Sequence, residues 1–282
     1  MTPLVWDCRG RRLEIGLRPL VMGIVNVTPD SFSDGGQFLD PAAAVDHGLR
    51  LVADGADILD VGGESTRPGA DPVPADEELR RVLPVVRELV KRAGVPVSVD
   101  TSKAGVAAAC LNVGVAIIND VTGLTDPAMV RSCVAAGAGV VMMHMRGTPQ
   151  TMQRDPQYTD VSAEVGDFLR DRLDALEAAG LPRDRVAIDP GIGFGKALDH
   201  TLQQIARLVE YKRFNRPVVL GLSRKGFLGQ ITGRERPDRL AGTLAVNCFA
   251  VAAGAAHVLR VHDVAAHRDA ALLHEAIARH AR

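Results

Sequence analysis

Leu20-Val-Met-Gly-Ile-Val-Asn26 is the stretch that decides the fold, because it opens a pattern that the rest of the chain repeats. This apolar run is followed by an alanine- and leucine-rich segment with helical spacing at 41–55, and then by a second apolar run, Ile58-Leu-Asp-Val-Gly62. Continuous apolar runs bounded in this way indicate strands that are buried on both faces. The pattern therefore predicts a parallel sheet whose strands are joined by helices.

The same alternation continues to the end of the chain. Candidate strands lie at 20–26, 58–62, 95–100, 116–121, 140–145, 186–189, 218–223 and 258–262, and helical spacing marks 41–55, 77–93, 104–113, 161–179, 202–211 and 239–254. Eight such repeats in 282 residues fit an α/β fold of the closed (β/α)8 TIM barrel type better than an open doubly wound sheet. No linker interrupts the chain, so we expect one domain over 1–282.

Two short apolar stretches precede the first of these strands, within Val5 to Ile15 and on either side of Gly10. Two such stretches around a glycine are typical of a β-hairpin. We expect this N-terminal β-hairpin to cover the N-terminal end, or bottom, of the barrel.

The formal net charge is −1 and the pI is about 6.7. A nearly neutral chain lacks the positive surface that attracts nucleic acid or an anionic membrane, so we expect neither as a partner. The apolar stretch at 248–256 is shorter than the roughly 20 residues of a membrane-spanning helix. The N-terminus has no signal-peptide pattern, so we expect no export.

The cysteines show no CxxC spacing and lie in alanine-rich surroundings; they are Cys8, Cys110, Cys133 and Cys248. This arrangement favours buried, reduced thiols over a disulfide framework or a zinc site. We therefore expect a cytoplasmic protein.

Polar residues gather where the predicted strands end, which is where such barrels place their chemistry. Long loops rich in glycine, proline and charge follow the first two strands, at 28–36 and 62–69. The other strands end in polar residues, namely Asp100-Thr101, Asn119-Asp120, His144, Asp189, Ser223-Arg224-Lys225 and Arg260-Val-His-Asp263.

Asp100 and Asp189 each follow an apolar run inside a strand, where an unpaired carboxylate would cost several kcal/mol if it were merely structural. We therefore interpret both as functional. Helix capping is the better explanation for Thr101 and Asp263. Asn119 and Asp120 must point to opposite faces of their strand, and we expect Asn119 to face the interior of the barrel.

Lys225 follows a strand, whereas the other lysines lie in helical or linking segments, where we expect solvated side chains; they are Lys91, Lys103, Lys196 and Lys212. Arg260 and His262 share one face of the last strand and need an anionic partner, with an internal ion pair as the alternative. A Schiff-base role for Lys225 is a lesser alternative.

Acids and an amide thus come from one part of the barrel and cations from another, near the region where such barrels commonly bind phosphate. This sorting predicts a two-ended ligand, with a phosphate ester at one end and a flat group rich in hydrogen-bond donors at the other. The sequence has neither GxGxxG nor GxxxxGK[ST], so a Rossmann dinucleotide site and a P-loop are not expected.

The motifs at 22–36, 60–69, 99–101, 118–121, 143–145, 189–196, 221–226 and 260–264 together resemble those of the dihydropteroate synthases. The resemblance implies condensation of 6-hydroxymethyl-7,8-dihydropterin pyrophosphate with p-aminobenzoate, using Mg²⁺ and releasing pyrophosphate. It also implies a homodimer.

The resemblance further implies the roles of individual residues. The pterin would be held by Asp100, Asn119, Met143, Asp189, Phe194, Gly221 and Lys225. Pyrophosphate would meet Asn26, Arg67, Arg260 and His262, and Asn26 would also hold the metal. The p-aminobenzoate would contact Phe32, Thr66, Arg67, Pro68, Ser223 and Lys225. The expected catalytic residues are Asp30, Arg67, Asp100 and Lys225.

The implied mechanism requires no strong base, because an arylamine is already nucleophilic, and stabilisation of the leaving group should dominate. Two alternatives are a pterin-binding paralogue without turnover and a folate-dependent methyltransferase of the same barrel family. The methyltransferase would have no use for Ser223-Arg-Lys225 and Arg260-Val-His262 as a pyrophosphate site. The paralogue would be expected to have a broken first or second loop, and both loops are intact.

Overall fold

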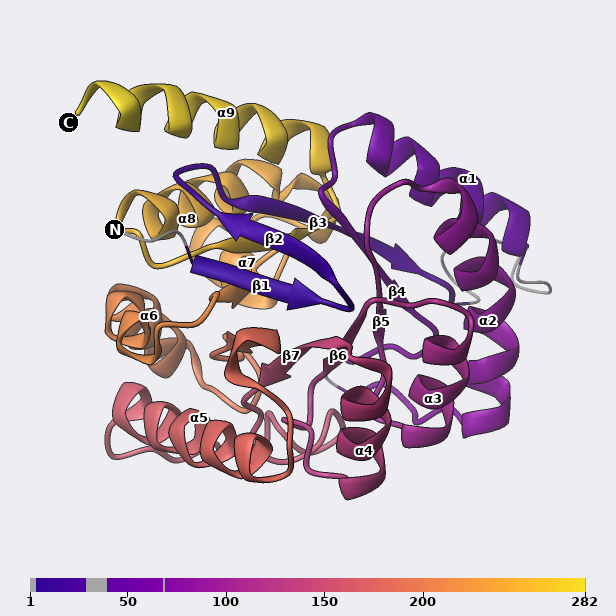
Figure 1. Ribbon diagram of the computed structural model, residues 1–282. Helices are drawn as coiled ribbons and strands as arrows, with labels where there is room; N and C mark the ends of the chain where they lie inside the picture. Colours follow the sequence, from indigo (N-terminus) through magenta and orange to yellow (C-terminus); the bar gives the residue numbers. More distant parts are fainter. Residues whose placement is uncertain (1–3, 29–39, 68, 282) are drawn as a thin grey trace.

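The computed structural model describes residues 4–28, 40–67 and 69–281. Within these residues, eight parallel strands form a barrel (Figure 1): β3 (Leu20–Asn26), β4 (Ile58–Gly62), β5 (Val97–Asp100), β6 (Ile117–Asp120), β7 (Gly139–Met143), β8 (Val186–Asp189), β9 (Val219–Leu220) and β10 (Val258–Val261). The strand order is β8-β7-β6-β5-β4-β3-β10-β9. A parallel bridge between Ile188 and Val218 joins the two ends, so the predicted (β/α)8 barrel is confirmed.

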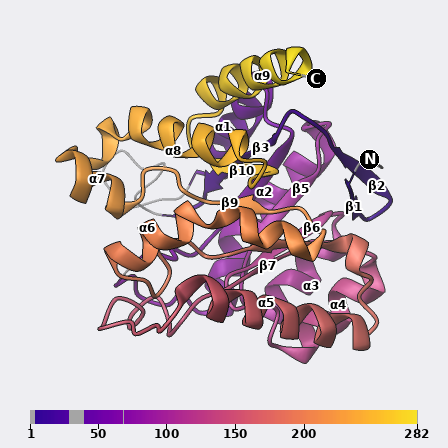
Figure 2. The same cartoon turned by 90° about the vertical axis from the view of Figure 1, so that its left-hand side faces the viewer.

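Helices cover the outside of the barrel in chain order (Figures 1 and 2): α1 (Pro41–Ala53), α2 (Ala75–Arg92), α3 (Ala104–Asn112), α4 (Pro127–Ala136), α5 (Val161–Ala178), α6 (Leu198–Ala206), α7 (Gly226–Thr232), α8 (Leu240–Ala252) and α9 (Val264–His280). Aspartates cap several of these helices at their first turn. Asp40 accepts from Ala42 N and Asp126 from Ala128 N, each at 2.8 Å. The predicted helix 202–211 is instead α6 followed by a 3-10 turn over Leu208–Phe214.

The N-terminal hairpin closes one end of the barrel, as predicted. Strands β1 (Leu4–Cys8) and β2 (Arg11–Ile15) are antiparallel and meet at Arg9 and Gly10, which both have positive φ, as tight hairpin turns require. Trp6 is fully buried against the apolar residues that begin the barrel strands. Figure 2 shows this hairpin at one end of the barrel and α7 towards the other.

Cys8, Cys110 and Cys133 are buried free thiols, as expected. The prediction is wrong for Cys248, which is exposed on α8 because it follows Asn247, whose side chain faces the core. Among the described residues, no helix is long and apolar enough to cross a membrane.

Candidate active site

The alternation of side chains along the strands builds both the core and a cavity. Every barrel strand except β5 places an apolar side chain in the cluster beneath the hairpin, and the residue two positions later faces the opposite end of the barrel. This relation holds for Ile117 and Asn119, Val141 and Met143, Ala187 and Asp189, Val219 and Gly221, and Val258 and Arg260. The second residue of every pair lines a cavity of about 1300 Å³.

All of the predicted site residues within the described part of the chain line this one cavity: Asn26, Thr66, Arg67, Asp100, Asn119, Met143, Asp189, Phe194, Gly221, Ser223, Lys225, Arg260 and His262. Asp30, Phe32 and Pro68 lie outside the described residues. The structure therefore brings together residues from all eight barrel strands or the loops that follow them.

A charged network lies on the floor of the cavity. The Arg260 guanidinium donates through Nε to Asp60 at 2.6 Å and through Nη2 to Asp100 at 2.8 Å. Burial acts to lower the pKa of Arg260, but the two carboxylates outweigh this effect and raise it. Burial raises the pKa of Asp100 to about 7, Arg260 opposes this rise, and Asp60 adds to it.

The internal ion pair that the sequence offered as an alternative for Arg260 is therefore present. It does not use the whole guanidinium, because Nη1 makes no hydrogen bond to any described residue. Arg260 can thus pair with both carboxylates and still offer a donor to an anion in the cavity.

Asp60 is a site residue that the sequence analysis missed. It is fully buried, and the oxygen that accepts from Arg260 also accepts from Asn119 Nδ2 at 3.1 Å. A signal was available, since Asp60 lies two residues after Ile58 in an apolar strand and must share its inward face.

Asn119 faces the interior, as predicted, whereas Asp120 faces away from it. Asp120 accepts from the backbone N–H groups of Thr122 at 2.8 Å and Leu124 at 3.0 Å, which stabilises the turn after β6. The capping role predicted for Thr101 is wrong, because α3 has no side-chain cap; its hydroxyl accepts instead from Lys103 N at 3.2 Å, in the turn before the helix.

Asp189 and Lys225 face the cavity from β8 and from the loop after β9. Asp189 Oδ1 accepts from Gly191 N at 2.7 Å, and burial raises the pKa of this carboxyl. Lys225 Nζ donates to the carbonyl of Ile192 and lies 4.0 Å from the centre of the Phe194 ring. Burial lowers the pKa of Lys225 to about 7, although the nearby Asp189 opposes the change.

The predicted solvated position of Lys196 is wrong. Its side chain is 3 % exposed, and Nζ contacts His144 Nδ1 at 3.0 Å, Gly191 O at 2.8 Å and Phe194 O at 3.0 Å. The physical reason is the path of the loop after β8, which folds back over the end of β7. At Gly191, with φ +65°, an added Cβ would lie 1.8 Å from His144 O, so this close approach needs glycine. His144 contacts Lys196 but does not line the cavity.

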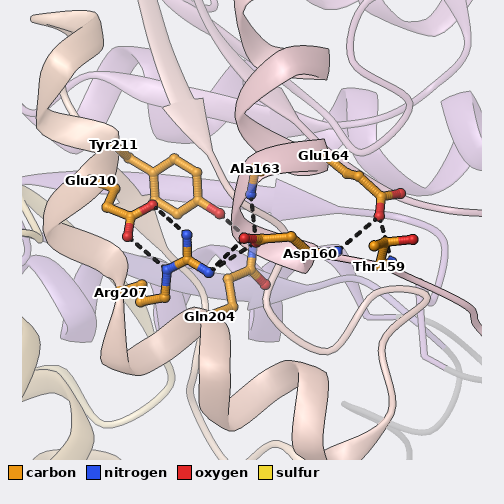
Figure 3. Close-up of polar contacts among 8 residues, drawn as sticks. All are labelled: Thr159, Asp160, Ala163, Glu164, Gln204, Arg207, Glu210 and Tyr211. Carbon is orange, nitrogen blue, oxygen red and sulfur yellow. Dashed lines mark hydrogen bonds and ion pairs between the residues drawn. The ribbon is translucent and has the colours of Figure 1, made fainter.

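A second set of contacts supports the same loop from outside. Gln204 Nε2 donates to Pro190 O and to the Tyr211 hydroxyl, each at 3.0 Å. Figure 3 shows Arg207 between Asp160 and Glu210, which ties the start of α5 to the end of α6. None of these residues lines the cavity, and the bond to Pro190 O fixes the start of the loop that carries Phe194.

The loops after β9 and β10 are joined by two neighbouring pairs. Ser223 Oγ lies 2.9 Å from His262 Nδ1, and Arg224 Nε donates to Asp263 at 3.0 Å. Asp263 makes no side-chain cap of α9, so its predicted capping role is wrong. Its carboxylate accepts from the Arg224 guanidinium instead. Burial and the neighbouring guanidinium groups lower the pKa of His262 to about 3, so this imidazole is neutral at pH 7 and can approach an anion as an N–H donor.

Comparisons with known proteins agree with this geometry. The family model described as "Pterin binding enzyme" matches residues 22–262. The dihydropteroate synthase of Escherichia coli K12 is 46% identical over 256 residues, which cover 91% of this chain and 90% of that relative. The fold also matches dihydropteroate synthase structures from Xanthomonas albilineans with 4-aminobenzoic acid (49% identity, TM-score 0.90, 98% of each chain) and from Yersinia pestis with a sulfonamide drug (41% identity, TM-score 0.91, 99% of this chain and 100% of that chain). The chain therefore belongs to the dihydropteroate synthase family of pterin-binding enzymes.

Proposed function

We propose that this chain is a transferase that joins 6-hydroxymethyl-7,8-dihydropterin pyrophosphate to p-aminobenzoate in folate biosynthesis, giving 7,8-dihydropteroate and pyrophosphate. The observation that supports this most directly is that one cavity holds partners for both ends of the substrate. Asp100, Asn119 and Asp189 offer acceptor oxygens at strand ends, whereas Arg67 and His262 offer N–H donors on the loops after β4 and β10.

The pterin end is proposed to lie among the buried carboxylates. The 2-amino-pyrimidinone edge of a pterin is flat and rich in donors, which suits the acceptor oxygens of Asp189 and Asn119. Met143 and Phe194 offer apolar surface to the ring. Gly221 has no side chain, and even an added Cβ would stay 4.0 Å from Arg260 Cδ, so a planar ring has room there.

The pyrophosphate is proposed to meet Arg67, His262, Asn26 and the unused Nη1 of Arg260. The p-aminobenzoate is proposed to lie between the loops after β4 and β9, against Thr66, Arg67, Ser223 and Lys225. Phe32 and Pro68 remain proposals for the same subsite.

Mg²⁺ is proposed to be held by Asn26 at the end of β3, together with the pyrophosphate of the substrate. Among the described residues, no group of three His, Cys, Asp or Glu side chains could hold a metal. Mg²⁺ often keeps several waters and binds through few protein oxygens plus substrate phosphates, so one amide oxygen lining the cavity fits such a site. When bound, the ion would neutralise charge on the departing pyrophosphate.

The residues then need to perform little covalent chemistry. The C–O bond between the pterin methylene carbon and pyrophosphate breaks, and its electron pair leaves with pyrophosphate. The arylamine nitrogen forms the new C–N bond and loses a proton to water. In this SN1-like sequence, Arg67 and Arg260 stabilise the departing anion, and the Asp100 carboxylate stabilises positive charge that develops on the pterin. The same role is proposed for Asp30.

A pyrophosphate-release assay tests the proposal. We expect release that depends on both substrates and is lost when EDTA removes Mg²⁺. Release that does not depend on p-aminobenzoate would contradict the proposed transfer.

We expect kcat/KM for the pterin substrate to have a maximum near pH 7. Below about pH 7 Asp100 gains a proton and loses its negative charge, and above about pH 7 Lys225 loses its positive charge, so each limb should approach a tenfold fall per pH unit. Asp60→Asn should move the acidic limb to lower pH, because Asp60 raises the pKa of Asp100. An acidic limb that stays in place in a folded Asp60→Asn variant would show that Asp100 does not titrate there.

We also propose a cytoplasmic homodimer. Large apolar side chains are exposed on α7, α8 and α9, where a second copy could cover them: Ile231, Phe249, Leu272, Leu273 and Ile277. Three buried free thiols suit a reducing compartment. Sedimentation velocity should give a mass near twice 30.0 kDa, and a monomer at micromolar concentration would contradict the dimer.

A further inference from the structure

Lys103 joins the loop after β4 to the segment between β5 and α3. Its ammonium group donates to Glu78 Oε2 at 2.5 Å and also to the carboxylate of Glu64. Glu78 lies on α2 with a fully buried side chain, whereas the side chains of Lys103 and Glu64 are 23% and 21% exposed. Burial acts to lower the pKa of Lys103, but its hydrogen bonds to the two carboxylates outweigh this effect and raise it, so the group is a cation.

This cluster is unbalanced, because one ammonium group serves two carboxylates. The second oxygen of Glu78 is buried and has no hydrogen-bond partner among the described residues. Buried ion pairs of this kind are weak contributors to stability compared with apolar packing, although breaking one is costly. The contacts around Glu64 indicate a different role for the cluster, which is to position the segment that follows β4.

Glu64 begins the segment 64–67 that presents Thr66 and Arg67 to the cavity. The base of this segment is fixed on α2, where Arg81 Nη1 donates to Gly63 O at 3.0 Å. An added Cβ at Gly63 would lie 2.6 Å from Val82 Cγ1, so the backbone packs directly on that helix. The next residue, Glu64, is held by Lys103, which lies three positions after Asp100 at the end of β5.

The segment is also held beyond its far end, because Gly69 N donates to Pro149 O at 3.0 Å. Arg67 is exposed, and the hydrogen bond from its N–H to Ser65 Oγ is long, at 3.4 Å. Thr66 and Arg67 therefore lie between two fixed points, Glu64 and Gly69, and Glu64 is the anchor on the side of β4.

We propose that Lys103 is a positioning residue for the arylamine half of the active site, acting through Glu64 on the segment that presents Thr66 and Arg67. The inference rests on the proposed function and assigns a role to a residue that does not line the cavity. Its expected signature is selective, since the pterin end is built from strand ends that Lys103 does not touch.

The test is to measure the KM of each substrate in Lys103→Met, Lys103→Arg and Glu64→Gln. We expect Lys103→Met and Glu64→Gln to raise the KM for p-aminobenzoate roughly 10- to 100-fold, as a displacement of about 1 Å can do. The KM for the pterin substrate should rise much less, because that substrate loses only its contact with Arg67 and keeps those proposed with Arg260, His262 and the strand ends. Lys103→Arg should restore most of the affinity, because a guanidinium can bridge two carboxylates. Glu64→Gln keeps the Lys103–Glu78 pair, so it gives an answer even if Lys103→Met does not fold.

Two controls separate positioning from general stability. Lys91→Met removes an exposed lysine on α2 and should leave both KM values as in the wild type. In the Arg67→Ala background, Glu64→Gln should add little, because the group that it positions is gone.

The inference would be overturned by an unchanged KM for p-aminobenzoate in folded Glu64→Gln, by equal losses for both substrates, or by full additivity with Arg67→Ala. A wild-type protein that makes no dihydropteroate would instead refute the proposed function, so the two failures are distinguishable.

Discussion

Replacing Asp189 with alanine is expected to weaken binding of a pterin analogue by about 3 kcal/mol, or roughly 100-fold. Asp189 is buried at the end of β8, and its carboxylate is the proposed partner of the pterin donors. Without it, donors on the pyrimidinone ring would be desolvated and left unpaired, which is more costly than losing an exposed hydrogen bond. Isothermal titration calorimetry measures the change directly.

The fold should survive this substitution. Oδ1 of Asp189 accepts from Gly191 N, and Lys196 holds the same loop independently through two carbonyl oxygens. Asp199→Ala, which removes an exposed carboxylate on α6, is the matched control and should bind as the wild type does. Wild-type affinity in an Asp189→Ala protein with a normal melting transition would place the pterin elsewhere.

Arg67→Ala is expected to remove most of the coupling between the two ends of the site. The proposed aminobenzoate subsite takes Thr66 and Arg67 from the loop after β4, and Arg67 is also the proposed partner of pyrophosphate. Pyrophosphate with Mg²⁺ should therefore tighten binding of p-aminobenzoate or a sulfonamide by roughly 5- to 150-fold, equivalent to about 1 to 3 kcal/mol. In Arg67→Ala this gain should largely disappear, whereas pterin binding should remain.

The measurement is a titration of the aminobenzoate analogue with and without pyrophosphate and Mg²⁺, in both proteins. Arg170→Ala on the exposed face of α5 serves as the control, because that guanidinium contacts neighbouring carboxylates of the same helix. If the wild type binds the analogue equally well in both conditions, the second subsite is preformed and the loop does not couple the two ligands.

Much of this site was predictable because it follows from strand periodicity. A run such as 186–189 ends in an aspartate, parallel strands of a barrel end on the same side, and the alternation of side chains selects Asn119 over Asp120. These inferences need nothing beyond the local pattern and the barrel.

Strand periodicity could not predict which residues form ion pairs with each other across the barrel. Arg260 pairs with Asp60 from 200 positions away, and Lys103 reaches Glu64 across 39. Lys196 was misplaced on the surface because its burial depends on how one loop folds over β7, which apolar spacing does not encode. Sequence periodicity thus indicates which face a residue occupies on a strand, whereas loop residues acquire their surroundings from tertiary packing.

The most direct test of the central claim is product analysis after incubation of the wild-type protein with both substrates and Mg²⁺. Chromatography with mass spectrometry should find 7,8-dihydropteroate and pyrophosphate in equal amounts, each limited by the scarcer substrate. Pyrophosphate without the conjugated product would identify a hydrolase, and a protein that binds the pterin tightly but forms neither product would be a binding protein; either result would contradict the account.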